Sequence, residues 1–289
     1  MTEYRVKKEL RLIDYLIDIG YTRTKVKQLI KHRALEVNGK ITPDVGQLLC
    51  KGDTVSVRKD KKESKAALSP GMKIIFEDDD LIVIEKPAGL LTIASETEKT
   101  KTAYYQLNEF LKLRSPQKGE RIFIVHRLDR DTSGLIMFAK NENAKKTLQG
   151  NWKEVEKRYY ALVEGTPKKK EGTIQSRLSE TKSLKVFIDP HSDSAKLSKT
   201  KYRVIKTGRD YSLLDILLET GRKNQIRVHL SQIKHPVAGD KKYGAMTNPL
   251  GRLGLHSYSI KFKHPLTGTL LCFKSKLPRK FNTGLGPVA

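Results

Sequence analysis

The chain has 289 residues, of which 37% are hydrophobic and 31% charged, so it is long enough to bury a core and too apolar for wholesale disorder. Its 57 Lys and Arg outnumber 32 Asp and Glu, and the net charge of +25 predicts a polyanionic partner. The longest stretches free of charged residues have only about ten residues, whereas a membrane span needs roughly 20. The N-terminus has no signal-peptide core, and the two cysteines form no CxxC pair. We therefore expect a cytoplasmic protein that binds nucleic acid rather than a membrane.

The first 60 residues predict a small unit of helices and short strands. Apolar residues recur at helical spacing over residues 10–19, and Gly20 is suited to end that helix. A second helix is expected to begin at Thr22 or Thr24, either of which is a good N-terminal cap. The β pattern that follows includes an Asn38-Gly39 hairpin turn, with short strands at residues 35–37, 48–49 and 54–57.

The second helix is predicted to face RNA or DNA. Residues 21–40 carry six Lys or Arg and one acid, and most of these bases lie off the apolar face of the helix. A solvated polar face is the alternative, but the overall charge favours nucleic acid. The candidate RNA-binding residues of this helix are Arg23, Lys27 and Lys31.

Residues 61–72 predict a linker between two domains, at residues 1–60 and 73–289, because this charged stretch contains a Ser-Pro pair. In the second domain, short apolar β runs intermix with amphipathic helices without a regular βαβ rhythm. The expected fold class is therefore α+β, with a mixed, largely antiparallel sheet flanked by helices. The β runs lie at 74–76, 81–84, 122–125, 135–138, 159–163 and 213–218, the helices at 102–113, 143–156 and 223–234, and a further basic region at 166–209.

The most unusual short stretch is HRLDRDTSGL, residues 126–135, which joins two apolar strands. One interpretation is a plain turn made by Asp, Thr, Ser and Gly. The other is a carboxylate presented on a loop between rigid strands and kept ionised by flanking arginines. Physical reasoning alone does not choose between Asp129 and Asp131.

Three further stretches attract attention. In TGRKNQIRVHL, residues 220–230, a strand ends and a helix begins, and Arg222 at the junction can project into a cleft unless it is an ordinary surface arginine. In EKRYYALV, residues 156–163, two tyrosines lie on a predicted strand. The acidic run at residues 77–80 is better explained as a solvated turn than as a metal site. The histidines match no common metal-ligand spacing either, so we expect no bound metal.

Taken together, these stretches resemble the RluA-type pseudouridine synthases over roughly residues 73–280, and residues 10–57 resemble an S4 RNA-binding domain. The resemblance implies an isomerase that converts uridine to pseudouridine in RNA without a cofactor, preceded by a small S4-like α/β RNA-binding domain. The matching blocks, in chain order, are DDLIVIEKPAGL, HRLDRDTSGL, KRYYALVEG, TGRKNQIRVHL with HPVAGDKKYG after it, and LGLHSYSIKFKHPLTG.

The resemblance also implies roles for single residues. The family's nucleophilic aspartate falls on Asp129 and its active-site tyrosine on Tyr159. The arginine of TGR, Arg222, is expected to pair with the catalytic carboxylate. Ile226 is expected to pack against the site, and Arg127 to contact the substrate.

At Asn224 the sequence departs from the family pattern TGRxHQ, which has His there, so the resemblance assigns this position no role. The reaction needs a carboxylate and a base. It remains open whether Asp129 attacks C1′, attacks C6 or abstracts a 2′ proton, and whether Tyr159 stacks on the base or moves the proton.

The resemblance to the S4-bearing branch of the family implies large-subunit ribosomal RNA as the substrate, with transfer RNA as the alternative. Two other functions compete: a non-catalytic RNA-binding or ribosome-assembly protein, and a metal-dependent nuclease using Asp129 and Asp131. The intact set of Asp129, Tyr159 and Arg222 argues against the first, and the lack of a third clustered carboxylate argues against the second. We expect a monomer that takes an unpaired or flipped-out uridine.

Overall fold

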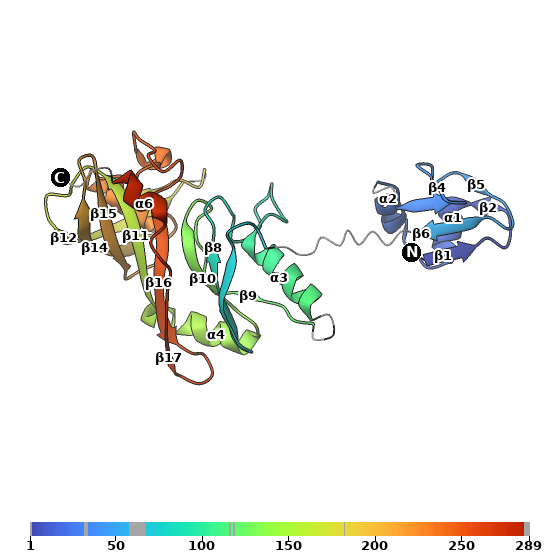
Figure 1. The fold of residues 1–289 in the computed structure, drawn as a ribbon, viewed down its shortest axis with the longest axis horizontal. Coiled ribbons are helices and arrows are strands. Elements are labelled where there is room, and N and C mark those ends of the chain that lie inside the picture. Colours follow the sequence, from blue (N-terminus) through green and yellow to red (C-terminus); the bar gives the residue numbers. More distant parts are fainter. Residues whose placement is uncertain are drawn as a thin grey trace. The chain divides into compact units, whose positions relative to one another are not determined.

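The computed structural model describes residues 2–31, 34–57, 68–115, 117, 119–181 and 183–285. The chain divides into two compact units, Met1–Lys65 and Ala66–Ala289, and each is described by itself (Figure 1). Residues 61–67 of the expected linker lie outside the described residues, so the domain boundaries stay a prediction.

The N-terminal unit packs helices α1 (Leu12–Asp18) and α2 (Arg23–Lys31) on a sheet with strand order β1-β6-β3-β4, beside a separate β2-β5 pair. The first helix begins at Leu12, because Leu10 pairs in β2 instead of joining the helix as predicted. Thr22 caps α2 by accepting a hydrogen bond from Lys25 N at 3.2 Å. The strands are Thr2–Arg5 (β1), Leu10–Arg11 (β2), Leu35–Val37 (β3), Lys40–Ile41 (β4), Leu48–Leu49 (β5) and Thr54–Val57 (β6).

Helix α2 is amphipathic as its sequence predicts. Val26 and Leu29 are buried in the core of the N-terminal unit, whereas Arg23 and Lys27 are exposed. The side chain of the third candidate, Lys31, lies outside the described residues. Two of the three predicted RNA-binding side chains are therefore free to meet a ligand.

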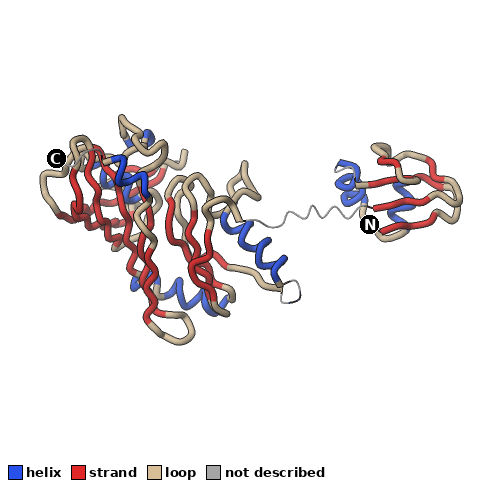
Figure 2. Tube along the Cα trace, in the orientation of Figure 1, coloured by secondary structure: helices blue, strands red, loops and turns tan. Residues whose placement is uncertain are grey.

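The C-terminal unit is built on one 11-stranded sheet, and its α+β class is as expected (Figure 2). Along the sheet the order is β13-β12-β14-β15-β11-β16-β10-β8-β7, with β17 paired to β16 and β9 to β10. The strands are Lys73–Glu77 (β7), Leu81–Lys86 (β8), Phe123–Ile124 (β9), Ser133–Ala139 (β10), Glu156–Glu164 (β11), Glu171–Glu180 (β12), Val186–Ile188 (β13), Lys196–Thr207 (β14), Tyr211–Leu218 (β15), Leu255–Lys263 (β16) and Leu270–Lys274 (β17).

Helices cover both faces of this sheet. On β8, Ile82 and Ile84 point into a core shared with α3 (Ala103–Arg114) and α5 (Gln225–Gln232), while Leu81 and Val83 point into a core shared with α4 (Glu142–Gly150). The last helix, α6 (Arg279–Gly284), packs on a smaller cluster through Phe281. None of the helices in the described residues has the length and hydropathy needed to span a bilayer.

Most strand pairs are antiparallel, but β10 and β16 pair in parallel through Ser133↔His256 and Gly134↔Ser257. We call this short pairing the seam of the sheet. Gly134 has φ +112, and a Cβ there would lie 2.1 Å from the carbonyl oxygen of Ser257, so only glycine fits. The HRLDRDTSGL stretch ends at this seam, which brings its loop to the middle of the sheet.

Candidate active site

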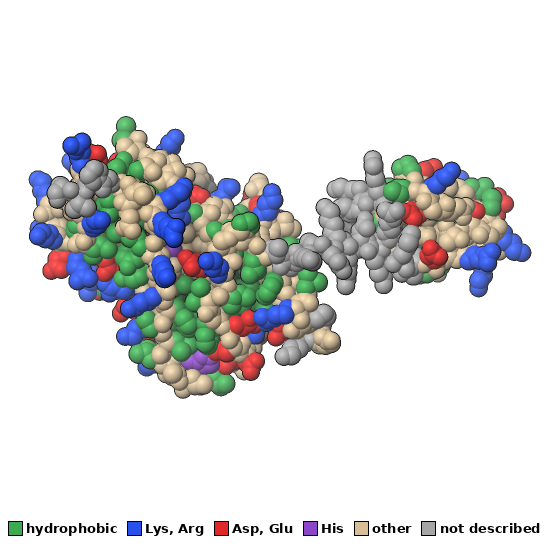
Figure 3. Space-filling model, in the orientation of Figure 1, with side chains coloured by type: hydrophobic (Ala, Val, Ile, Leu, Met, Phe, Trp, Pro, Cys, Tyr) green, Lys and Arg blue, Asp and Glu red, His purple; other side chains and the backbone are tan. Residues whose placement is uncertain are grey.

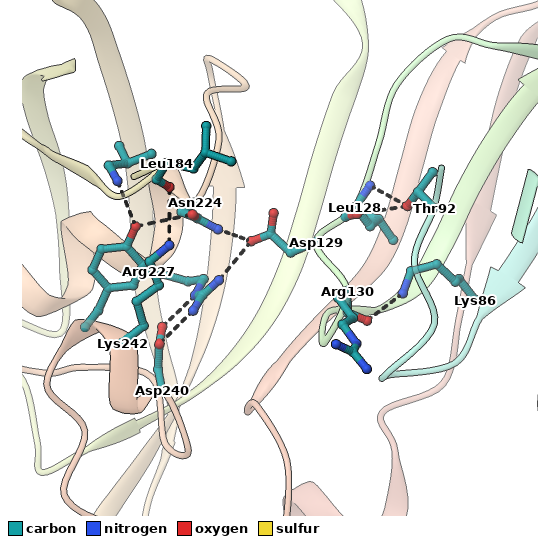
Figure 4. Close-up of polar contacts among 12 residues, drawn as sticks. Lys86, Thr92, Leu128, Asp129, Arg130, Leu184, Asn224, Arg227, Asp240 and Lys242 are labelled. Carbon is teal, nitrogen blue, oxygen red and sulfur yellow. Dashed lines mark hydrogen bonds and ion pairs between the residues drawn. The ribbon is translucent and has the colours of Figure 1, made fainter. Parts of the chain in front are cut away.

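Asp129 lies on the loop that leads into β10, and the backbone of this loop is held on both sides. On one side, Thr92 Oγ1 donates to the carbonyl of Leu128 at 2.8 Å and accepts from its N–H at 3.2 Å. On the other side, Lys86 Nζ donates to the carbonyl of Arg130 at 3.0 Å (Figure 4). The position of the Asp129 backbone is therefore set by both of its neighbours.

Lys86 is fully buried, which is unusual for a lysine. Its three donors are matched by backbone carbonyls, because Nζ also bonds Leu90 O at 2.7 Å and Pro87 O at 3.0 Å. Burial lowers the pKa of Lys86 to about 7, against an opposing effect of the nearby carboxylates of Asp131 and Asp129. Lys86 acts as a structural clamp that ties β8 to the Asp129 loop.

The carboxylate of Asp129 is bound by two residues at the start of α5. Asn224 Nδ2 donates to Asp129 Oδ2 at 2.6 Å, and Arg227 Nη1 lies 3.3 Å from the same oxygen (Figure 4). Arg227 is itself held by Asp240, through Nε to Oδ2 at 2.6 Å and Nη2 to Oδ1 at 2.8 Å. The Asp240 side chain is 1% exposed, so this second ion pair is well shielded from solvent.

The expected partner of Asp129 is corrected by this geometry. Among the described residues, the arginine paired with Asp129 is Arg227 and not Arg222. Residues 224 and 227 share one face of a helical turn, whereas Arg222 precedes the helix and its side chain is exposed. Arg222 still lines the same pocket, so a role in binding or catalysis stays a prediction for it.

Tyr159 enters the pocket from β11. The register between β11 and β16 shifts between Arg158 and Tyr159, and such a bulge re-aims the side chain that follows it. Tyr159 is 7% exposed. Burial raises the pKa of Tyr159 to about 12, with a smaller opposing effect of a hydrogen bond with Ser257 and a further rise from the charge of Asp129. The phenol therefore keeps its proton at neutral pH.

Tyr160 points to the opposite face of β11. Its ring stacks on that of Tyr258 at 3.8 Å between centroids and 11° between planes. Of the two neighbouring tyrosines, Tyr159 is thus the one that faces the pocket.

The pocket has a volume of about 180 Å³ and brings all five predicted site residues of the C-terminal unit together. Sequence reasoning missed Arg227 and Asp240, although both lie in the quoted blocks. A helical reading of QIRVH places Arg227 one turn after Asn224, which is a signal that could have found it. The predicted residues that line the pocket are Arg127, Asp129, Tyr159, Arg222 and Ile226.

Asp78, Asp80 and His264 lie close enough to suggest a cation site. However, His264 Nδ1 accepts the backbone N–H of Leu266 at 3.3 Å and of Thr267 at 3.1 Å. Its Nε2 must then carry the proton that bonds Asp78 at 3.0 Å. Asp78 and His264 are thus hydrogen-bond partners of each other, and His264 also stabilises the turn that follows it.

Two buried histidines, His229 and His256, and the half-buried His126 also make structural hydrogen bonds. His229 bonds Thr200 through Nδ1 at 2.8 Å and Ser176 through Nε2 at 3.0 Å. Burial lowers the pKa of His126 to about 3 and those of His229 and His256 to about 4. All three are therefore neutral at pH 7.

Comparison with known proteins gives a consistent result. Residues 80–232 match the RNA pseudouridylate synthase family, and residues 11–55 match the S4 domain. An uncharacterised RNA pseudouridine synthase of Bacillus subtilis (strain 168) is 34% identical over 264 residues, which is 89% of this chain and 86% of the relative. The ribosomal large subunit pseudouridine synthase D of Vibrio cholerae is 31% identical, over 89% of this chain and 84% of that protein. The solved structure of human RNA Pseudouridylate Synthase Domain Containing 4 superposes with a TM-score of 0.62 at 25% identity, covering 75% of this chain and 92% of that one.

Proposed function

The chain belongs to the RNA pseudouridylate synthase family, and we propose that it isomerises specific uridines in large-subunit ribosomal RNA with Asp129 as the catalytic carboxylate. One observation carries the assignment of Asp129. Its carboxylate is presented on a backbone clamped on both sides, with one oxygen bound by Arg227 and Asn224, in a pocket shared with Tyr159. Rigid placement and a cationic partner are what an ionised catalytic group needs.

The reaction balances without a cofactor. The C1′–N1 bond of uridine breaks, the uracil ring turns, and a C1′–C5 bond forms. The proton on C5 leaves, and N1 ends the reaction protonated, so that the product is an isomer of the substrate. The ionised carboxylate acts on the electron-poor sugar or base carbon during this exchange.

Tyr159 contacts the base of the flipped uridine. Its phenol is protonated at neutral pH because burial raises its pKa to about 12, so it is a stacking surface and a hydrogen-bond donor rather than a phenolate base. The pocket of about 180 Å³ suits a single nucleobase. A paired uridine must therefore be extruded before it can enter.

The choice of ribosomal RNA is supported by two findings. The relative from Vibrio cholerae is named for the ribosomal large subunit, and the N-terminal unit matches the S4 domain with Arg23 and Lys27 exposed on α2. We propose that the protein works in the cytoplasm as a monomer. Transfer RNA is the competing substrate.

The test is tritium release from RNA labelled at C5 of uridine, with 23S ribosomal and transfer RNA transcripts as separate substrates. Wild-type protein is expected to release tritium from ribosomal RNA, and Asp129→Asn is expected to release none. Asp131→Asn is the matched control, since Asp131 is the exposed aspartate two residues further along the same loop. Its release should equal that of wild type.

Each other outcome has a meaning. Equal release by wild type and Asp129→Asn would remove Asp129 from the reaction. Release from transfer RNA alone would make transfer RNA, and not ribosomal RNA, the substrate. RNA binding without release from either transcript would favour the non-catalytic RNA-binding protein.

A further inference from the structure

We propose that Asn224 is a positioning residue for Asp129, and that it fixes the carboxylate through a hydrogen bond whose direction is set by Tyr243. This inference rests on the proposed function and deepens it. It concerns the position at which this chain carries Asn in place of the His of its family pattern.

The backbone at Asn224 is shaped for this contact. Asn224 precedes the first residue of α5 and has φ +51 and ψ +16, the left-handed region that Asn tolerates better than most residues. It is 9% exposed. From this position its side chain points across the pocket to Asp129 rather than capping its own helix (Figure 4).

The orientation of the amide follows from its two neighbours. A carboxylate can only accept, so the nitrogen of Asn224 must face Asp129, at 2.6 Å. The oxygen of Asn224 accepts from the hydroxyl of Tyr243 at 3.2 Å. That hydroxyl in turn accepts the backbone N–H of Val186 at 3.3 Å, which leaves its own proton for Asn224. The amide therefore has one favourable orientation.

The chain of contacts reaches the hairpin between β12 and β13. Val186 begins β13, and Lys242, the neighbour of Tyr243, donates to Leu184 O in the same hairpin at 3.3 Å (Figure 4). Tyr243 also carries Arg227 over its ring, at 5.0 Å from the centroid. Both groups that hold the carboxylate are thus braced by one buried tyrosine.

The consequence concerns which carboxylate oxygen stays available. Within the described residues, the hydrogen bonds to the Asp129 side chain all go to Oδ2. The other oxygen, Oδ1, is left for the substrate. The charged and titratable groups near the carboxylate are Arg227 on Oδ2, Asp240 behind that arginine, Lys86 beneath the loop, Asp131 on the loop, and Tyr159 and Tyr243 in the walls. Three further basic residues line the same pocket: Arg127, Arg222 and Lys223. The amide of Asn224 adds a neutral hydrogen-bond donor whose charge does not change with pH.

The decisive variant is Asn224→Asp, which keeps the shape and the tolerance for positive φ but replaces the donor by a second carboxylate. With enzyme in excess over ribosomal RNA, the maximum single-turnover rate of tritium release should fall roughly 10- to 100-fold at neutral pH. The acidic limb of the pH–rate profile should also move to higher pH, because two facing carboxylates share a proton. Tyr243→Phe keeps the ring against Arg227 and should show a smaller loss.

Asn141→Asp is the matched control. Asn141 also donates its amide to an aspartate, to Asp80 at 2.8 Å, and it lies at the start of α4, where Asp is an equally good cap. It does not line the pocket. The control should lose thermal stability because it also places two carboxylates face to face, but it should keep the wild-type rate and pH profile.

Two results would overturn the proposal. The first is an Asn224→Asp protein with the wild-type rate and pH profile. The second is a loss of rate in Asn224→Asp that is matched by Asn141→Asp at equal loss of stability, which would make the effect one of folding alone.

A substrate-free measurement separates this inference from the proposed function. With ¹³C-labelled aspartate carboxyls, the Asp129 resonance, assigned by its absence in Asp129→Asn, should change its chemical shift in Asn224→Gly, because the carboxylate loses a hydrogen-bond donor. An unchanged resonance refutes the role of Asn224 even if wild type releases no tritium. Absence of release by wild type, by contrast, refutes the proposed function only.

Discussion

Arg227 contacts two carboxylates of different exposure, Asp129 at 25% and Asp240 at 1% of the side chain. Its planar fork bonds Asp240 through Nε and Nη2 and leaves Nη1 for Asp129. Lysine has a single ammonium and cannot reproduce this arrangement. The rate of isomerisation should therefore depend on the guanidinium itself and not only on its charge.

Arg227→Lys is expected to lower the single-turnover rate of tritium release roughly 10- to 100-fold and to cost about 1–3 kcal/mol of unfolding free energy. Arg222→Lys should have a smaller effect on the rate, since Arg222 is exposed and does not hold Asp129. A larger loss of rate in Arg222→Lys than in Arg227→Lys would make Arg222 the functional partner of the carboxylate after all. Arg279→Lys, an exposed substitution in α6, is the control for general effects.

The clamp formed by Lys86 gives a pH-dependent prediction. Burial lowers the pKa of Lys86 to about 7, while an unfolded lysine titrates near 10.5. Between these values the unfolded chain binds more protons than the folded one, so the contribution of Lys86 to stability rises with pH, by up to about 1.4 kcal/mol per pH unit. It is smallest below pH 7, where the buried amine is charged in both states.

Lys86→Met keeps the length of the side chain and leaves the carbonyls of Pro87, Leu90 and Arg130 without their donor. The gap in unfolding free energy between wild type and Lys86→Met should be smallest at pH 6 and grow through pH 7.5 and 9. Urea denaturation at the three pH values measures it, and the titrations of all other groups cancel in the difference. A gap independent of pH would show that Lys86 titrates as an ordinary lysine.

At the scale of the elements, the seam between β10 and β16 supports the Asp129 loop. A Cβ at Gly134 would lie 2.1 Å from Ser257 O, and φ there is +112. Gly134→Ala is expected to destabilise the C-terminal unit by about 3 kcal/mol, because the strand must move and the backbone is strained. Thermal unfolding of Gly134→Ala measures this cost.

Gly150→Ala is the control, since a Cβ at the end of α4 meets nothing within 4 Å. It should be neutral or stabilise by up to about 1 kcal/mol. Equal stability of the two variants would mean that the seam tolerates a side chain and does not fix the loop.

Strands were predictable from sequence where both faces of the sheet are covered. The run Leu81–Ile84 is apolar on both faces, because α3 and α5 lie on one side and α4 on the other. The basic region 166–209 gave no such run, yet it contains β12, β13 and β14. In β14 the residues Ser198 and Thr200 are buried and Lys199 and Lys201 point outward, so one face is polar and the other is charged. Although β14 lies inside the sheet between β12 and β15, a strand of this composition lacks the apolar signal that sequence reasoning depends on.

The site shows the same division between local and long-range information. Asp129, Tyr159, Arg222 and a helix over residues 223–234 could be predicted from the motifs, because each is a local feature of one block. The contacts that hold the Asp129 carboxylate join residues 95 or more positions apart, as in the pair with Asn224. Only the assembled sheet and the phase of α5 decide that Arg227 and not Arg222 meets the carboxylate. Motif spacing therefore identifies residues of the site, and tertiary packing determines which of them contact one another.

At the scale of the whole molecule, the net charge of +25 is available for RNA binding. Lys and Arg side chains are spread over the visible faces of both units (Figure 3). Binding that neutralises phosphates releases counterions, so affinity for RNA should fall steeply and linearly on a log–log plot against salt. A flat dependence would show that this charge is not used on the RNA backbone.

The contribution of α2 can be separated from the rest of this charge. Each phosphate contact to single-stranded RNA adds about 0.7 to the slope, so the double variant Arg23→Ala, Lys27→Ala should reduce it by roughly 1.4. Lys112→Ala is the control, because Lys112 is already paired with Glu109 at 2.9 Å. Fluorescence anisotropy of labelled ribosomal RNA fragments at several salt concentrations measures the slopes. An unchanged slope in the double variant would place α2 off the RNA and leave phosphate binding to the C-terminal unit.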